Sequence, residues 1–167
     1  VFGGGVRDVR AMASPAAKVR RTGKQKQQAL GRIESLVVEN FKSYEGRHEI
    51  GPFDKFTCII GPNGSGKSNI MDAISFCLGI RAKHLRGERL KDLVYRREEE
   101  DVESNARSAR VILVFRAANG ELLHFGRTID AKGTGTYRYG QPDRMKSVNY
   151  DDFMAALAEQ SIFVKAR

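Results

Sequence analysis

The order of apolar and polar residues predicts strands at the start of the chain and one early helix. Residues 33–41 (IESLVVENF) are largely apolar and predict a strand, and a short second strand is expected around 48–50. The mostly apolar run 56–60 (FTCII) predicts a buried strand. Residues 69–78 carry apolar side chains nearly all round, and Gly79 follows at the position of a helix C-cap. These features predict strand–loop–helix across 56–79.

Beyond residue 95 the pattern favours an antiparallel meander. Strands are expected at 110–117, 121–129 and 136–139, with Asn119-Gly120 as the hairpin turn between the first two. A short helix is predicted over 150–159, capped by Asn149 or Asp151, and a final strand over 161–164.

Charge separates a tail from the rest of the chain. The formal net charge is +9, and residues 1–32 hold eight basic residues against Asp8 alone, which leaves about +2 for the remainder. Residues 1–31 have few large apolar side chains, so we expect a disordered basic tail, with one folded unit over 32–167. The tail is typical of a nuclear import signal or a nucleic-acid arm, and equally of a solvated tail with no such role.

Two cysteines cannot make a disulfide framework. Cys58 falls in the predicted strand and Cys77 in the predicted helix, so both are expected to be small buried hydrophobes in a reducing compartment. No apolar run approaches the roughly 18 residues of a membrane span, and we expect no membrane association.

The main chemical signal is a phosphate-binding loop, G-x-x-x-x-G-K-[ST], between the predicted strand and helix. Its glycines allow the backbone to point N–H groups at a phosphate, and the helix that follows adds the positive end of its dipole. Lys67 would reach the β- and γ-phosphates, and the Ser68 hydroxyl would ligate Mg²⁺. The loop consists of Gly61, Pro62, Asn63, Gly64, Ser65, Gly66, Lys67 and Ser68, and the candidate site includes the next residue, Asn69.

Three stretches together resemble the amino-terminal head of structural maintenance of chromosomes (SMC) ATPases. They are ENFKSYEG at 39–46, GPFDKFTCIIGPNGSGKSNIMDAISFCLG at 51–79 and LRGERLKDLVY at 85–95. The resemblance covers 32–167 and is strongest over 33–95; GPFDKFT and the final SIFVKAR are most similar to the cohesin branch, in its first SMC subunit. It implies an α/β fold: the amino-terminal lobe of a P-loop, ABC-type ATPase head, with a mixed sheet and an antiparallel meander.

The resemblance also implies ligands, partners and further site residues. ATP and Mg²⁺ would bind the loop, with Lys42 and Ser43 as additional ATP contacts, although a surface lysine in a turn explains Lys42 equally well. Arg86 matches the position that links DNA to ATP turnover, although a solvated basic face would look the same. The implied partners are a second SMC subunit, a kleisin and DNA, in sister chromatid cohesion on chromosomes in the nucleus.

Other parts of a cassette ATPase do not occur in this sequence. We find no signature segment, no strand ending in Asp-Glu, no switch histidine and no long heptad run, and the family's glutamine would follow residue 167. We therefore expect an incomplete head that hydrolyses no ATP alone, whereas the full protein would be an ATPase. The alternatives are a RecN-like or Rad50-like repair ATPase, a P-loop phosphotransferase, and a non-catalytic nucleotide-binding module.

Overall fold

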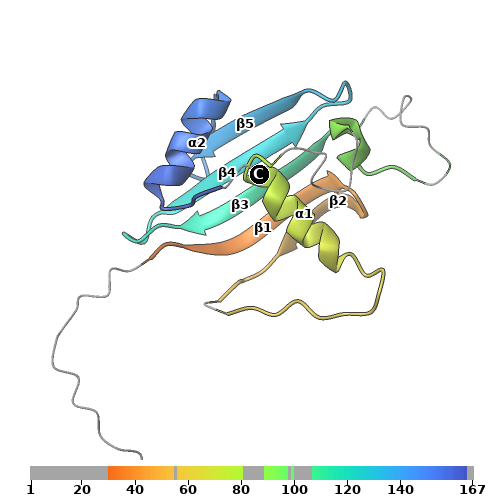
Figure 1. Cartoon of the computed structure of the whole chain (residues 1–167), viewed down its shortest axis with the longest axis horizontal. Helices are drawn as coiled ribbons and strands as arrows, with labels where there is room; N and C mark the ends of the chain where they lie inside the picture. The colour runs from red at the N-terminus through yellow and green to blue at the C-terminus, as the bar shows by residue number, and fades with distance from the viewer. Residues whose placement is uncertain (1–29, 55, 81–88, 98, 100–106, 165–167) are drawn as a thin grey trace, which may run out of the picture.

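The computed structural model describes residues 30–54, 56–80, 89–97, 99 and 107–164. Its strands form one antiparallel sheet in the order β2-β1-β3-β4-β5-β6 (Figure 1). The strands are β1 (Arg32–Phe41), β2 (Tyr44–Ile50), β3 (Ala109–Arg116), β4 (Leu122–Ile129), β5 (Gly135–Gly140) and β6 (Lys146–Val148). The helices are α1 (Lys67–Cys77) and α2 (Tyr150–Glu159), with a 3₁₀ turn, η2 (Leu90–Leu93).

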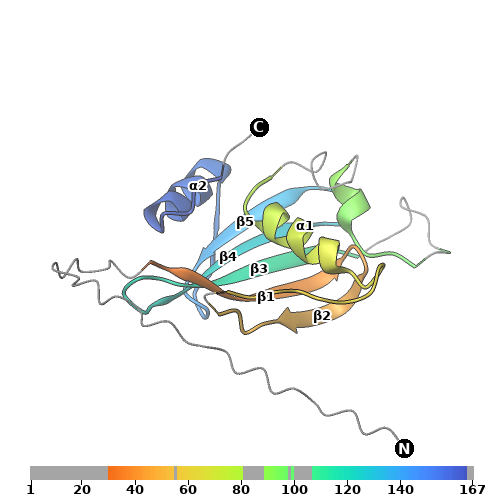
Figure 2. The same cartoon turned by 60° about the horizontal axis from the view of Figure 1, so that its bottom comes forward.

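Both α-helices lie on the same face of the sheet (Figure 2). Strand β3 shows why: its residues alternate, and every second one from Ala109 to Phe115 is buried toward the helices. Phe125 of β4 lies at the centre of this core, 5.9 Å from the ring of Phe153 on α2. From α1, the side chain of Phe76 packs into this core and is fully buried. Each such side chain contributes about 1.5–3 kcal/mol through burial.

Most of the predicted elements are confirmed. Strands β1, β3, β4 and β5 lie within one or two residues of their predicted bounds, and α2 has its predicted bounds. Gly79 follows α1 with φ 88°, and Gly120 takes φ 87° in the β3–β4 turn, so both glycines occupy the left-handed conformation that the turns require. Of the two proposed caps for α2, Asn149 is the one used, because its side chain accepts from the Asp152 N–H at 2.8 Å.

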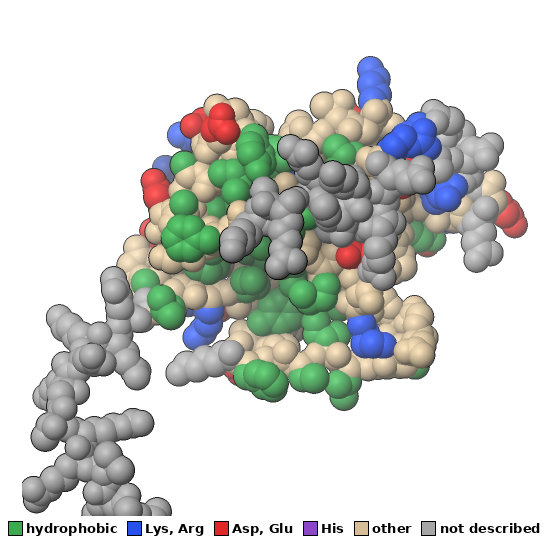
Figure 3. All heavy atoms as spheres, viewed as in Figure 1, with side chains coloured by type: hydrophobic (Ala, Val, Ile, Leu, Met, Phe, Trp, Pro, Cys, Tyr) green, Lys and Arg blue, Asp and Glu red, His purple; other side chains and the backbone are tan. Residues whose placement is uncertain are grey.

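The buried strand predicted at 56–60 is wrong. This segment is irregular, with Phe56 88% and Ile60 86% exposed, and Cys58 is exposed as well. A strand needs a neighbour to pair its N–H and C=O groups, and the described sheet pairs none of its six strands with 56–60. The sheet that was expected to be mixed is therefore antiparallel throughout the described residues. Figure 3 shows apolar side chains gathered on this segment.

The strand predicted at 161–164 is also absent from the structure. Ser161 takes φ 60°, and the Ile162 N–H donates to the Leu157 carbonyl at 3.0 Å, so the chain turns at the end of α2. Phe163 is 81% exposed. Apolar residues alone did not make a strand there, because the segment has no paired neighbour among the described strands.

Two further expectations lie outside the described residues: the basic tail up to residue 29 and Arg86. No helix in the described part of the chain is long and apolar enough to cross a bilayer.

Candidate functional site

The loop before α1 has the backbone of an anion-binding turn. Gly64 and Gly66 take φ 82° and 86°, and the Ser65 N–H donates to the Pro62 carbonyl at 3.3 Å, so the chain curls. Gly66 is the N-cap of α1 and offers no side chain to its free N–H groups. The first turn of α1 carries no acidic residue. The positive end of the helix is therefore directed at the loop.

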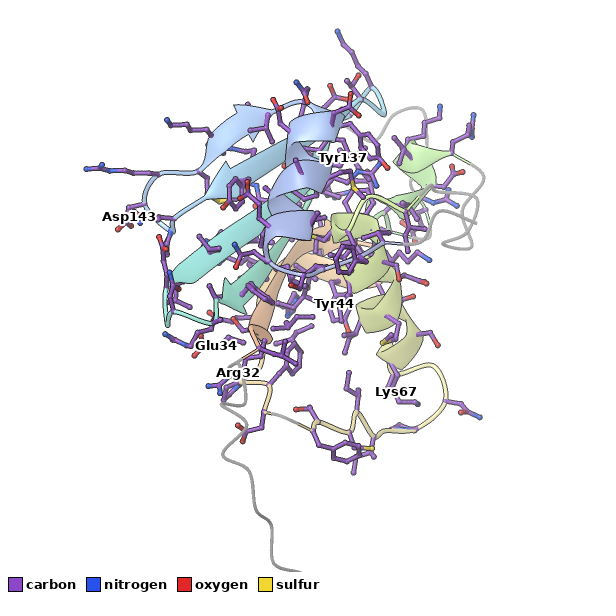
Figure 4. All side chains as sticks on the ribbon, turned by 60° about the vertical axis from the view of Figure 1, so that its left-hand side comes forward. Arg32, Glu34, Tyr44, Lys67, Tyr137 and Asp143 are labelled. Atoms are coloured by element: carbon purple, nitrogen blue, oxygen red, sulfur yellow. The ribbon has the colours of Figure 1, made fainter. Side chains whose placement is uncertain are left out.

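Lys67, the first residue of α1, folds back over the loop (Figure 4). Its Nζ donates to the Gly61 carbonyl at 2.7 Å and to the Pro62 carbonyl at 2.5 Å. The ammonium group thus lies where the curl brings its carbonyls together. A phosphate at the loop would offer the same ammonium group stronger, charged acceptors.

Beside Lys67 an open groove of about 410 Å³ runs between α1 and the segment 56–59. Its lining is mainly apolar, and Ser68 contributes an exposed hydroxyl. The described residues contain no group of three or more His, Cys, Asp or Glu side chains that could hold a metal ion. Of the residues that line this groove, Ser68 is the predicted Mg²⁺ ligand.

The turn between β1 and β2 packs along the same helix. The Lys42 Nζ lies 2.6 Å from Asp72 Oδ2, and the Asn69 amide donates to the Ser43 hydroxyl at 2.8 Å. Two predicted site residues, Lys42 and Ser43, are thus brought to α1, and Asn69 faces Ser43. Lys42 lies beside the helix rather than in the curl of the loop.

Tyr44 extends this contact to the loop itself. Its hydroxyl donates to the Gly66 carbonyl at 3.3 Å, and burial raises the pKa of this phenol above its usual range. A side chain at Gly66 would lie 3.3 Å from both the Tyr44 and Ser43 oxygens. The β1–β2 turn therefore forms a wall on one side of the phosphate-binding loop.

The far end of α1 is held by Arg127 of β4. Its guanidinium donates to the carbonyls of Phe76 and Ile80, each at 3.0 Å, and lies 5.0 Å from the ring centroid of Tyr137. Burial lowers the pKa of Arg127 from its usual value. A cation at the C-terminal end of a helix satisfies its last carbonyls and complements the dipole.

Cys77, next to Phe76, is a packing residue rather than a nucleophile. It is fully buried, and its Sγ lies 3.0 Å from the Phe125 carbonyl. Burial raises the pKa of the thiol to about 12, so it stays protonated at neutral pH. The burial expected for this cysteine is confirmed, unlike that of Cys58.

Sequence reasoning missed three residues of this arrangement: Tyr44, Asp72 and Arg127. Only Asp72 carried a signal, because it is a carboxylate between the apolar residues Met71 and Ala73; in the structure it is 9% exposed. The partners of Tyr44 and Arg127 lie 22 and 51 residues away along the chain, at Gly66 and Phe76. No local pattern reports contacts of that separation.

Comparison with known proteins gives one matching family and a consistent set of relatives. The model for the RecF/RecN/SMC N terminal domain matches residues 32–165. Structural maintenance of chromosomes protein 1 of Arabidopsis thaliana is 49% identical over 137 residues, which are 82% of this chain and 11% of that protein. Structural maintenance of chromosomes protein 1 of Schizosaccharomyces pombe is 43% identical, over 83% of this chain and 12% of the length of that protein. The chain thus spans about a tenth of the length of these relatives.

Solved structures give the same fold. An Smc head domain from Pyrococcus furiosus, bound to the C-terminal domain of ScpA, is 31% identical with a TM-score of 0.69, over 80% of this chain and 34% of its own. A structure described under ATP-driven dimerization and DNA stimulated activation of SMC ATPases has a TM-score of 0.68 at 31% identity, over 78% of this chain and 80% of its own. RecF bound to ATP, at 16% identity and a TM-score of 0.60, shares the fold over 79% of this chain and 32% of its own.

Proposed function

The chain belongs to the RecF/RecN/SMC N-terminal domain family, and from that premise we propose that its residues 61–69 bind the triphosphate of ATP in the head of an SMC1-type ATPase. The observation that carries the proposal is the curl of the loop. Two glycines in the left-handed conformation direct the chain into the uncapped start of α1, with Lys67 folded over the same carbonyls. Backbone N–H groups, a helix N-terminus and a lysine on one concave turn favour a phosphate group.

Lys67 and Ser68 of the loop, and the residues beside it, then have distinct parts. Lys67 leaves the Gly61 and Pro62 carbonyls and neutralises charge on the phosphates. Ser68 offers its exposed hydroxyl as one ligand to Mg²⁺, which commonly takes one or two protein ligands beside substrate phosphates. Bound there, Mg²⁺ would neutralise phosphate charge. Lys42 and Ser43 form the side of the site, and Asn69 holds Ser43 in place.

Hydrolysis requires parts of the protein beyond this chain. Within the described residues no acidic side chain lies in the first turn of α1 or lines the groove beside Lys67, so no general base is placed to activate water. The exposed apolar side chains of Phe56, Ile60 and Met71 form a surface that favours burial against the remainder of the head. We therefore propose that the chain alone is inactive and that the full-length protein hydrolyses ATP.

The relatives support a proposal about partners. SMC heads are described as dimerizing under ATP and as stimulated by DNA, and an archaeal head binds ScpA. We propose that the full-length protein pairs with a second SMC subunit and a kleisin, and that it acts with DNA, through Arg86, in sister chromatid cohesion on nuclear chromosomes. A DNA-repair role, as in the RecN part of the family, is the second candidate; the 49% identity to an SMC1 protein favours cohesion.

Titration of the full-length protein with a fluorescent ATP analogue tests the nucleotide site. The wild-type protein should bind the analogue in the presence of Mg²⁺, and Lys67→Ala should abolish binding without changing the melting temperature. Unchanged affinity in Lys67→Ala would refute the assignment. Lys132→Ala, a change at an exposed lysine in the β4–β5 turn, serves as the matched control. Purification from cells would then identify the partner subunits.

A further inference from the structure

Four consecutive residues of the β1–β2 region contact successive turns of α1. Phe41 lies 5.3 Å from the ring of Phe76, and the next three residues make the contacts already described. The pairs run in opposite directions along the two segments: Phe41–Phe76, Lys42–Asp72, Ser43–Asn69 and Tyr44–Gly66. Helix positions three or four apart share one face, so the whole stretch follows a single face of α1 down to the loop.

The backbone of this turn is also held from its other side. The Lys42 N–H donates to the Leu93 carbonyl at 2.8 Å, and the Tyr95 N–H donates to the Asn40 carbonyl at 2.8 Å. Lys42 itself takes φ 50°, an uncommon conformation for a residue with a side chain. The contact with α1 therefore involves a turn whose path is already set by the sheet and by residues 93–95.

Among the polar pairs, the ion pair is the buried one. The side chains of Lys42 and Asp72 are 13% and 12% exposed, and Asp72 stands on α1 between the buried residues Ile70 and Ala73. A carboxylate in such surroundings is costly unless a cation matches it. Asp72 also lies five residues after Lys67, about 7 Å along the helix axis from the start of the helix. It is therefore placed to hold Lys42 rather than to touch the phosphates.

We propose that Asp72 is a positioning residue for the nucleotide site. Through its ion pair with Lys42 it holds the β1–β2 turn on α1, which keeps the Tyr44 hydroxyl against the Gly66 carbonyl and the wall against the loop. The inference rests on the proposed function of the loop, and it assigns to Lys42 a role that depends on Asp72. The turn supports the loop as a whole, so the pair affects the binding of ATP and ADP alike.

The test compares nucleotide affinities of full-length variants. Asp72→Asn removes the charge at nearly constant shape, and Lys42→Met removes the other half of the pair. Each should weaken the binding of ATP and of ADP by the same factor, roughly tenfold. The double variant should lose little more than either single variant, because the two residues act as a unit. Asp72→Glu keeps the carboxylate and should retain affinity within about twofold of the wild-type value.

Glu34→Gln is the matched control, because it removes an ion pair of 2.8 Å with Arg116 elsewhere in the sheet. Its nucleotide affinity should stay at the wild-type value. If Asp72→Asn lowers the melting temperature too far for titration, Lys42→Met carries the test alone, and equal losses for ATP and ADP remain the expected result.

Three outcomes would overturn the proposal: unchanged affinity in Asp72→Asn, additive losses in the double variant, or a loss in Lys42→Met confined to ATP. The last would mean that Lys42 contacts the terminal phosphate independently of Asp72. Lys67→Ala in the same assay separates this inference from the proposed function. If Lys67→Ala abolishes binding and Asp72→Asn has no effect, the nucleotide site stands and only the role of Asp72 fails.

Discussion

The guanidinium of Arg127 lies 4.4 Å above the ring centroid of Phe76 and donates to the carbonyl of the same residue at 3.0 Å. One side chain of β4 thus holds both the ring and the backbone of the last turn of α1. The phosphate-binding loop precedes the other end of this helix. The position of α1 on the sheet, and with it that of the loop before α1, therefore depends in part on a contact about ten residues from Gly66.

Arg127→Met tests this anchor. The substitution removes the Arg127 donor from the carbonyls of Phe76 and Ile80, of which the Phe76 carbonyl keeps the Gly79 N–H, and it removes a buried cation from an aromatic ring, so we expect a loss of about 2–3 kcal/mol in stability. Thermal unfolding of the full-length protein should show a lower melting temperature for the head. Arg110→Met is the control, because Arg110 is 45% exposed and lies 3.8 Å from Glu39, and an ion pair of that kind contributes at most about 1 kcal/mol. Equal melting temperatures for the two variants would contradict the anchor.

Gly66→Ala should weaken both stability and nucleotide binding. Gly66 has φ 86°, and an added methyl group would lie 3.3 Å from the Ser43 and Tyr44 oxygens, so the wall would have to move. Gly120→Ala is a close match, with φ 87° and nothing within 4 Å. Each variant should lose about 1–2 kcal/mol through left-handed strain. Only Gly66→Ala should raise the Kd for ATP, measured by titration of the full-length protein; equal Kd values would show that the wall has no part in binding.

Phe56→Asp should impair the full-length protein. Phe56 is 88% exposed in this chain, and we propose that the remainder of the head covers it. A carboxylate at a buried interface forfeits about 2 kcal/mol of apolar burial and adds a desolvation cost, so soluble yield and melting temperature should both fall. Leu30→Asp changes an apolar residue that is 82% exposed at the start of the described chain, and it should be tolerated. Similar behaviour of the two variants would argue that nothing covers Phe56.

His124 predicts a dependence of stability on pH. Burial lowers its pKa below the ordinary value of 6.5, more than the Asp143 and Glu49 carboxylates raise it. The unfolded chain therefore binds a proton at a higher pH than the folded chain does. The contribution of His124 to stability is complete above pH 6.5 and is lost as the pH falls from there through the folded pKa.

Melting temperatures measured between pH 8 and pH 5.5 check this dependence. The decline with falling pH should be smaller in His124→Gln than in the wild-type protein. A His124→Gln profile that superimposes on the wild-type profile would contradict the prediction.

The elements that sequence patterns predicted well are those that carry their own signals. Asn119-Gly120 predicts the β3–β4 turn, and Gly79 predicts the end of α1. Both glycines take a left-handed backbone conformation that residues with a side chain rarely adopt. The glycines of the loop 61–68 carry the same kind of signal, and the phosphate-binding role of the loop stays a prediction from its consecutive residues. The strand prediction for the segment 56–60 was wrong. Its apolar composition is that of a buried strand, but none of the described strands pairs with it.

The amino-acid order alone was enough to predict the turn before α1, the helix itself and the meander that follows, because turns, caps and hydrophobic periodicity act over a few residues. Only the folded chain decided that Lys42 meets Asp72, that Arg127 meets Phe76 and that Phe56 stays exposed. A buried charge or an unpaired strand must find its partner wherever the chain brings one. For these residues that partner lies tens of residues away or outside the described sheet.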